Sequence, residues 1–275
     1  MQTVICLGSK ACDVGEAFEQ NNNYDVKLFD VGIEGDNCFA IPKQESPEAY
    51  EKYCPDVSKQ LANCSDVIYF ITSGDSDVAS CSLKILQTVK DKTIYIFYIK
   101  PDASFLSKES VLLDKLYFNV FQEYTRSGVF KKMFLFDQRL IENCMGDVSV
   151  LTFKEEYSKF IYNTIHGLFA LKNIEPIINN QSSISDINRI ATLGYYDINN
   201  NYENLLFNLK NTDDKCYNFV FNEETLKKDN KLFKKIKDKI KEKNIDNIQV
   251  SYAIYSTDSN NDYCLIEQYT KFIQQ

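Results

Sequence analysis

Short apolar runs that alternate with amphipathic segments constrain the fold of this chain more than any other feature of its sequence. Thr3–Gly8, Asp66–Thr72 and Thr93–Pro101 are nearly continuous in apolar residues, as strands of a parallel sheet covered on both faces are. Tyr24–Gly32 and Lys132–Asp137 have the pattern of two further strands. Because helical patterns separate these runs at intervals of about 30 residues, the first part predicts an α/β domain with a doubly wound parallel sheet.

Helical patterns fill the gaps between these strands, and Ser107–Gly128 is the best defined. Its first residue is a good N-terminal cap and its last a good stop. Val57–Ser65 also has a helical pattern, whereas Asn37–Pro55 holds three of the five prolines and is typical of a loop. A longer amphipathic helix is predicted over Phe153–Leu171, and we expect it to connect two parts of the chain.

The pattern changes after this long helix. Strands are predicted at Lys215–Asn222, Ile248–Ser256 and Tyr263–Phe272, the last two as an antiparallel pair joined by a turn at 257–262. Helices are predicted at 184–194, 202–210 and 223–244. We therefore expect an α/β domain over 1–152, a central helix over 153–173 and a smaller α+β C-terminal domain over 174–275.

The charge balance argues against one class of partner. The chain of 275 residues carries a formal net charge of −8 and has a pI of about 4.9. Nucleic-acid binding needs clustered Lys and Arg to neutralise phosphates. The one lysine-dense stretch, Lys227–Lys243, has the amphipathic pattern of a solvated helix face. We therefore expect no direct contact with nucleic acid.

Cysteine, histidine and apolar runs restrict the chemistry and the location. The nine cysteines form no CxxC pair and His166 is the sole histidine, so we expect no metal site of the zinc type and no histidine-based triad. The N-terminus lacks the basic region and separate apolar segment of a signal peptide. No apolar run approaches the ~20 residues of a membrane span. We expect a cytoplasmic protein with free, mostly buried thiols and no membrane span.

The stretch FITSGDSDVASCSLKIL, Phe70–Leu86, has the strand–loop–helix order in which α/β proteins hold phosphates. Glycines let the backbone approach a phosphate closely, but Gly74 is the loop's single glycine. Asp75 and Asp77 would repel a phosphate unless a cation such as Mg²⁺ lies between them. A helix-capping role for Ser73, Asp75 or Asp77 explains the same residue types.

The order of the elements, together with particular residues, resembles the tubulin/FtsZ superfamily. LGSKACDVGEAFE lines up without gaps with the family's first loop, G-x-x-G-N-x-x-G before an aromatic residue. Gly8, Gly15 and Phe18 match this pattern, and Cys12 replaces its asparagine. The family signature G-G-G-T-G-[ST]-G falls on Gly74–Ser80, where only the first glycine is kept.

Later segments continue the resemblance. MFLFDQRLIE resembles the segment I-P-N-D-R-L-L, with Arg139 retained. IINNQSSISDINRI resembles the loop N-x-D-x-x-D that follows the central helix, with Asp186 retained and Gln181 and Ser183 replacing the first two polar residues. The strands after residue 214 follow the pattern of the family's C-terminal domain.

The resemblance implies that GTP lies over the strand ends of the first sheet, where Mg²⁺ could bridge a phosphate and the loop aspartates. Carried onto this chain, it assigns nucleotide contacts to Gly8, Ser9, Lys10, Cys12, Gly74, Asp75, Ser76, Asp77, Arg139 and Asn163. It assigns to Asp186 the catalytic role of polarising water over the nucleotide of a neighbouring subunit. The acid that reads the base is not recognisable, and either Ser158 or Asn163 stands near its position.

Several of these residues have equally simple structural roles. Lys10 either faces a phosphate or pairs with Asp13 or Asp75. Ser185 is a natural N-cap for a helix that begins at Asp186. The altered glycine signature favours a site that is weakened or lost, so the chain is either a weak GTPase or an inactive one, with GTP as cofactor only if the site works.

Three functions agree with these patterns. The first is a cytoskeletal protein that self-associates head to tail into filaments. The second is a non-catalytic member of the superfamily that regulates or scaffolds a homologous or adaptor protein. The third is an unrelated α/β enzyme with a small-molecule pocket at the strand ends. The missing glycines favour the first two, with little or no GTP hydrolysis.

Overall fold

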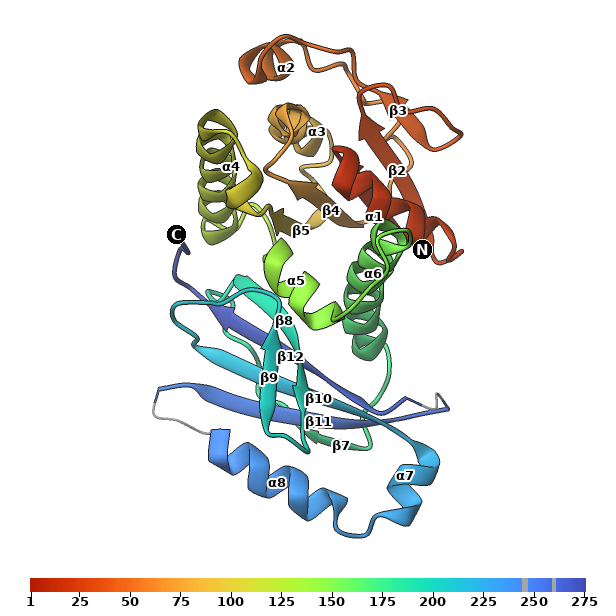
Figure 1. Ribbon diagram of the computed structural model, residues 1–275, viewed down its shortest axis with the longest axis vertical. Coiled ribbons are helices and arrows are strands. Elements are labelled where there is room, and N and C mark those ends of the chain that lie inside the picture. The colour runs from red at the N-terminus through yellow and green to blue at the C-terminus, as the bar shows by residue number, and fades with distance from the viewer. Residues whose placement is uncertain (244–246, 259–260) are drawn as a thin grey trace. The chain divides into compact units, whose positions relative to one another are not determined.

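The structure, a computed structural model, describes residues 1–243, 247–258 and 261–275 (Figure 1). The chain divides into two compact units, Met1–Asn163 with Gln275, and Thr164–Gln274. The boundary between the units falls within the long helix α6 (Phe153–Lys172). Each unit contains its own series of strands and its own buried residues.

The first unit is built on a sheet whose neighbouring strands are all parallel. Its strands are β1 (Gln2–Leu7), β2 (Tyr24–Asp30), β3 (Cys38–Ala40), β4 (Val67–Ser73), β5 (Thr93–Lys100) and β6 (Lys132–Asp137). The order β3-β2-β1-β4-β5-β6 changes direction between β1 and β4, where Leu7 pairs with Thr72. The loops after β1 and β4 therefore leave the sheet side by side, at the point where doubly wound folds bind ligands.

Helices cover both faces of this sheet. They are α1 (Ser9–Glu19), α2 (Pro47–Tyr53), the 3-10 helix η1 (Asp77–Cys81), α3 (Ser82–Thr88), the 3-10 helix η2 (Ala103–Phe105), α4 (Lys108–Arg126) and α5 (Gln138–Met145). Successive residues of β4 pack in opposite directions, because Tyr69 meets Tyr24 while Phe70 meets Phe121 of α4. Phe18 of α1 lies edge-on to the same Tyr24. Burial on both faces explains why β4 is apolar throughout.

The second unit has a mixed sheet. Its strands are β7 (Ile178–Asn180), β8 (Ile190–Asp197), β9 (Tyr202–Leu205), β10 (Asp214–Asn222), β11 (Gln249–Thr257) and β12 (Tyr263–Thr270), in the order β8-β12-β10-β11-β7 with β9 paired to β8. Between β10 and β11 the chain forms α7 (Glu223–Lys228) and α8 (Leu232–Lys243), which lie along one side of β11 in Figure 1. Leu232, Ile236 and Ile240 of α8 enter the core of this unit.

The predicted fold class is confirmed. The N-terminal part has a parallel sheet of the doubly wound kind, α6 is the long central helix, and antiparallel pairs occur in the C-terminal part. The predicted caps of α4 are confirmed as well. Ser107 Oγ accepts a hydrogen bond from the Ser110 amide at 3.0 Å, and Gly128 has a φ of 89°.

The loop predicted over Asn37–Pro55 is wrong, because it contains β3 and α2. The signal for α2 is local. Ser46 Oγ accepts a hydrogen bond from the Ala49 amide at 3.3 Å, and Pro47 occupies the first helical turn, where its missing N–H costs nothing. Prolines in this segment mark a helix start, whereas the sequence interpretation took them as loop residues.

The helix predicted over Val57–Ser65 is also wrong, since this segment forms only turns. The Leu61 amide bonds Val57 O, but the Cys64 amide then bonds Leu61 O, three residues back. The helical ladder therefore ends after one turn, which is too short to propagate.

Two further predicted helices, 184–194 and 202–210, are replaced by strands. The first gives a turn, in which the Asn188 amide bonds Ser185 O, followed by β8; the second begins with β9. β8 and β9 pair with each other, and Gly194 faces the backbone of β9 so closely that an added Cβ would lie 2.5 Å from Asn204 O. This cross-strand pairing, which local patterns do not contain, overrides the helical propensity.

The expected terminal pair of strands is corrected in its topology. β11 and β12 are not neighbours, because β10 lies between them and pairs parallel with β11 and antiparallel with β12. The helix predicted over 223–244 is divided at Asp229 into α7 and α8. Its last residue, Asn244, and residues 259–260 of the predicted turn lie outside the described residues.

We predict that Ile236→Ala lowers the free energy of unfolding by about 2–5 kcal/mol. Ile236 is fully buried between α8 and the sheet of the second unit, so truncation leaves a cavity. Phe233, on the same helix, is 44% exposed, and Phe233→Ala should cost about 0.5 kcal/mol or less. Urea unfolding followed by circular dichroism measures both values. Equal losses would contradict the assigned packing of α8.

We predict that the sole histidine makes stability depend on pH. Burial lowers the pKa of His166, which lies on α6, below its ordinary value of about 6.5. The folded state then keeps the imidazole neutral where the unfolded chain already binds a proton. This contribution is complete above about pH 6.5 and is lost as the pH falls through that value towards the lower folded pKa. Comparison of unfolding free energies of the native chain and His166→Gln across this range measures it. The native chain should lose more stability, and parallel curves would refute the assignment.

Candidate functional site

The carboxyl ends of β1, β4 and β6 bring three loops of the first unit together. Lys10, at the start of α1, lies 2.6 Å from Asp75 Oδ2 in the loop after β4. The same ammonium donates a hydrogen bond of 2.7 Å to Gln138 Oε1, at the start of α5 after β6. Gly8 has a φ of 89°, and an added Cβ would lie 3.5 Å from that of Ser76. This cluster, which we call the strand-end site, is the candidate functional site.

Lys10 is the centre of the strand-end site. Of the alternatives that the sequence leaves open, the structure shows the pair with Asp75 and not with Asp13. Gln138, whose oxygen accepts from Lys10, donates through Nε2 to Glu142 Oε1 at 2.9 Å. The amide is thereby oriented with its oxygen towards the ammonium. The positive charge of Lys10 is therefore compensated from within the chain.

Two further cations near the strand ends are paired as well. Lys154, at the start of α6, lies 2.8 Å from Asp13 Oδ1, and Arg139 Nη2 lies 2.9 Å from Asp137 Oδ2. The hydrogen bonds that Lys154 and Arg139 donate to these carboxylates raise the pKa of both cationic groups. Asp137 also accepts from the Arg139 amide and thus caps α5. Arg139, predicted to contact nucleotide, is fixed in this local pair.

Gly74 is required by packing. A Cβ at this position would collide with the Tyr98 hydroxyl and with Asp114, whose Cα it would approach to 2.9 Å. The Tyr98 hydroxyl donates to Asp114 Oδ1 at 2.7 Å, and Lys100 lies 3.1 Å from Asp114 Oδ2. Burial, followed by the charge of Asp114, raises the pKa of Tyr98. The glycine shared with the family signature therefore accommodates a buried network on β5 and α4.

The remaining loop residues do not form a cap. Ser76 is the N-cap residue of η1 but makes no capping hydrogen bond, and Asp77 is exposed in the first turn of η1. Ser73 Oγ is buried without a hydrogen-bond partner among the described residues. The predicted capping by Ser73, Asp75 or Asp77 is therefore wrong. Asp75 has an ionic partner, and the 3-10 turn begins with a backbone bond from the Ala79 amide to Ser76 O.

Ser9 and Cys12 lie on α1 but do not converge. Ser9 is exposed at the helix start. Cys12 is buried, and its thiol donates to Phe29 O of β2 at 3.5 Å. Burial, together with the charge of Asp30, raises the pKa of Cys12. Cys12 therefore serves the contact between helix and sheet.

A cavity of about 150 Å³ adjoins Lys10. It is lined by Lys10, Asp13, Gln138, Phe153, Lys154, Tyr157 and Ser158. The Tyr157 hydroxyl is buried and has no hydrogen-bond partner in the described parts of the chain, and burial raises its pKa. Of the two positions considered for base reading, Ser158 lines the cavity, whereas Asn163 is exposed further along α6 and does not.

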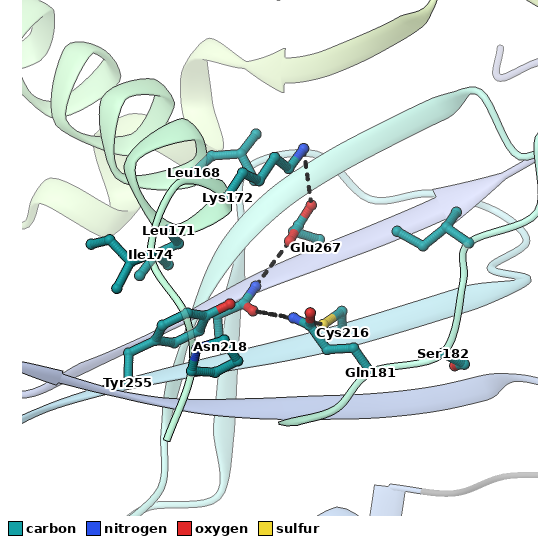
Figure 2. A pocket seen from close by; sticks show the side chains of 12 residues that line it. Leu168, Leu171, Lys172, Ile174, Gln181, Ser182, Cys216, Asn218, Tyr255 and Glu267 are labelled. Atoms are coloured by element: carbon teal, nitrogen blue, oxygen red, sulfur yellow. Dashed lines mark hydrogen bonds and ion pairs between the residues drawn. The ribbon is translucent and has the colours of Figure 1, made fainter. Parts of the chain in front are cut away.

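Asp186 lies in the second unit, exposed in the segment before β8. Its neighbour in the motif, Gln181, is directed into a cavity of about 320 Å³ (Figure 2). Gln181 Nε2 donates to Asn218 Oδ1 at 2.8 Å, and Asn218 Nδ2 donates to Glu267 Oε1 at 2.9 Å. Lys172 Nζ lies 3.9 Å from Glu267. Gln181 thus binds the sheet of its own unit, and Asp186 is the motif's one carboxylate.

The residues of the strand-end site do not fit a triphosphate cradle. The loop after β4 carries side chains where a phosphate would need bare backbone. Tyr98 and Asp114 occupy the space beside its glycine, Gly74. Lys10 is already paired with Asp75 and Gln138. Within the described residues, no group of three or more His, Cys, Asp or Glu side chains could hold a metal ion.

Sequence reasoning missed three residues of this region, and it considered Asp13 only as a partner of Lys10. Gln138 accepts a hydrogen bond from Lys10, Lys154 pairs with Asp13, and Asp114 completes the network that excludes a side chain at position 74. Gln138 stands next to Arg139 in a recognised motif, so its polarity was a usable signal. Asp114 had a weaker one, since it is an acid at a buried position of an amphipathic helix.

No protein-family model matches the chain, and no curated protein matches it. Solved structures do. An empty FtsZ dimer of M. jannaschii is 8% identical with a TM-score of 0.67, over 98% of this chain and 87% of that one. CetZ2 of Haloferax volcanii, a GTPγS-bound protofilament, is 12% identical with a TM-score of 0.69 (98% and 94%). A GTPγS-form protofilament of TubZ from Bacillus thuringiensis serovar israelensis is 12% identical with a TM-score of 0.73 (98% and 86%).

These similarities extend over nearly the whole chain, across both units. The chain has the fold of the tubulin/FtsZ superfamily, as its sequence pattern predicted, at low sequence identity. None of its described helices has the length and apolar composition that crossing a membrane requires.

We predict that Gly74→Ala lowers the free energy of unfolding by about 1–3 kcal/mol, because its Cβ overpacks Tyr98 and Asp114. Tyr98→Phe removes one colliding atom. The double variant should therefore lose less free energy of unfolding than the sum of the losses in the two single variants. Urea unfolding of the four proteins gives this coupling. If Gly74 served only a ligand, the single variant would keep the native stability.

Proposed function

We propose that this chain is a tubulin/FtsZ-like protein that self-associates head to tail, with weak or lost GTP binding and hydrolysis. The observation that carries the proposal is the closed state of the strand-end site, in which Lys10, Lys154 and Arg139 are each paired with a carboxylate of the first unit. A fold of this superfamily that has given up its phosphate cradle keeps assembly as its remaining activity.

Exposed apolar side chains support assembly. In the first unit, Val150 and Leu151, just before α6, are 93% and 95% exposed. In the second unit, Ile174 and Ile187 lie before and after the motif from Gln181 to Asp186, which the family resemblance places against a neighbouring subunit. Ile174 is 51% exposed and Ile187 is 61% exposed. Apolar side chains gathered in loops mark protein contacts. Two different surfaces, one from each unit, are what a heterologous, open-ended contact requires.

The solved relatives support the same proposal. CetZ2 and TubZ are both described as protofilaments in the GTPγS form. Those structures hold the nucleotide analogue, whereas the strand-end site here is closed by Lys10 and Asp75. The difference favours assembly whose extent does not depend on nucleotide.

The first test is sedimentation and electron microscopy of the purified chain. We expect filaments whose yield is the same without nucleotide, with GTP and with GDP. Leu151→Asp and Ile174→Asp should abolish pelleting while retaining the native melting temperature, because each places a charge in an apolar contact. Phe233→Asp, an exposed apolar side chain on α8 outside both surfaces, is the matched control and should still pellet.

Nucleotide affinity is measured with a fluorescent GTP analogue. We expect a Kd weaker than about 0.1 mM for the native chain. Asp75→Asn frees Lys10 and removes one negative charge, so it should tighten binding by about tenfold, or 1.4 kcal/mol. Micromolar binding by the native chain would refute the closed site. Light scattering that stays flat over a wide concentration range, with and without GTP, would refute self-association and favour a regulatory role towards another protein.

A further inference from the structure

Cys54 and Cys81 meet where α2 packs against η1. Cys54 directly follows α2 and is half-buried, and Cys81 is the last residue of η1 and is fully buried. Both are free thiols, as are the other seven cysteines of the chain. They stand 27 residues apart in the sequence, on either side of β4.

Contacts with backbone oxygens place both sulfur atoms at the boundary between α2 and η1. Cys54 Sγ lies 4.0 Å from Cys81 O and 3.7 Å from Pro55 O, and Cys81 Sγ lies 3.4 Å from Tyr50 O on α2. A sulfur–sulfur bond between them therefore needs no large movement of either helix.

The surroundings give the two thiols different reactivity. The interaction with the side chain of Cys81, and then the charge of Lys84, lower the pKa of Cys54. Lys84 on α3 is held at the end of α2, because its ammonium donates to Lys52 O at 3.0 Å. The interaction with the side chain of Cys54, followed by burial, raises the pKa of Cys81. Cys54 is thus the more accessible and more acidic thiol and Cys81 the buried thiol beside it, the arrangement of an oxidisable pair.

We propose that Cys54 and Cys81 form a peroxide-sensitive dithiol that closes to a disulfide between α2 and η1. The Cys54 thiolate attacks the O–O bond of hydrogen peroxide and becomes a sulfenic acid, and the departing hydroxide takes up a proton to leave as water. The Cys81 thiol then attacks the Cys54 sulfur, the S–S bond forms, and a second water leaves. Two thiols are oxidised, one peroxide is reduced, and a dithiol reductant reverses the change.

The disulfide would tie the segment that contains β4 and the loop Gly74–Asp77. Cross-linking two distant residues restricts the unfolded chain and stabilises the fold. Oxidation is therefore expected to raise the melting temperature by several degrees. It would also fix η1, the element that follows Asp75 and its pair with Lys10. The proposal concerns the first unit alone and does not depend on filament formation.

Cys38 provides a matched comparison. It is also half-exposed, but burial and the charges of Glu19, Glu16 and Asp36 raise its pKa. No cation is among these influences, so its thiolate is scarce at neutral pH. Cys38→Ser should therefore leave the peroxide reaction unchanged.

The test treats the whole reduced chain with stoichiometric hydrogen peroxide at neutral pH, alkylates the remaining thiols and maps the peptides by mass spectrometry. We expect one major new species, a peptide pair joined through Cys54 and Cys81, which dithiothreitol removes. Cys81→Ser should stop at a sulfenic acid on Cys54 that dimedone traps, and Cys54→Ser should form no disulfide. Lys84→Gln should slow alkylation of Cys54 by roughly tenfold without changing the fold.

Recovery of Cys54 and Cys81 as alkylated thiols after peroxide treatment would overturn the proposal. So would a disulfide that links either of them to another cysteine, or an equal rate of alkylation at Cys54 and Cys38 in the untreated chain. The readouts on the native chain and on Lys84→Gln do not require a cysteine variant to fold.

Discussion

The ammonium group of Lys10 joins the three loops that leave the carboxyl ends of β1, β4 and β6. It forms an ion pair with Asp75 and donates a hydrogen bond to Gln138 Oε1. Gly8 and Ser76 lie close to each other in the same loops. In a doubly wound sheet the loops after the strands come together at the carboxyl ends of those strands. A ligand or a side chain must compensate the charges that the loops carry there. In this chain a side chain does so. The loops are therefore ordered by the protein's own residues, which is the condition for a fold that does not rely on a bound ligand.

Much of the fold could be predicted from the sequence, because the dominant signals were local and strong. The apolar runs of β1, β4, β5 and β6 can be buried only in a covered parallel sheet, and α4 carries both its cap and its stop. The prediction was wrong where pairing with a distant strand decided the structure. β9 has a helical composition but lies against β8, and β12 pairs with β10 instead of with its sequence neighbour β11.

The site was less predictable than the fold for a related reason. Sequence could show that Gly74 and Lys10 occupy positions where a ligand would be held. It could not show that Asp114, forty residues further on, reaches Gly74 together with Tyr98, or that Gln138 bonds Lys10 across 128 residues. The chemistry of a loop depends on what is packed behind it, and that arrangement is fixed only when the sheet and helices assemble.

The first and last strands of the strand order are very short. These edge strands, β3 and β7, have three residues each. A short strand exposes few unpaired N–H and C=O groups, so it is a poor template for the addition of another chain. Amyloid-like growth along these edges is thereby suppressed, and the loops remain the surfaces through which copies of the chain can meet. The proposed head-to-tail assembly would need such protection, since an accessible sheet edge would divert subunits into disordered aggregates.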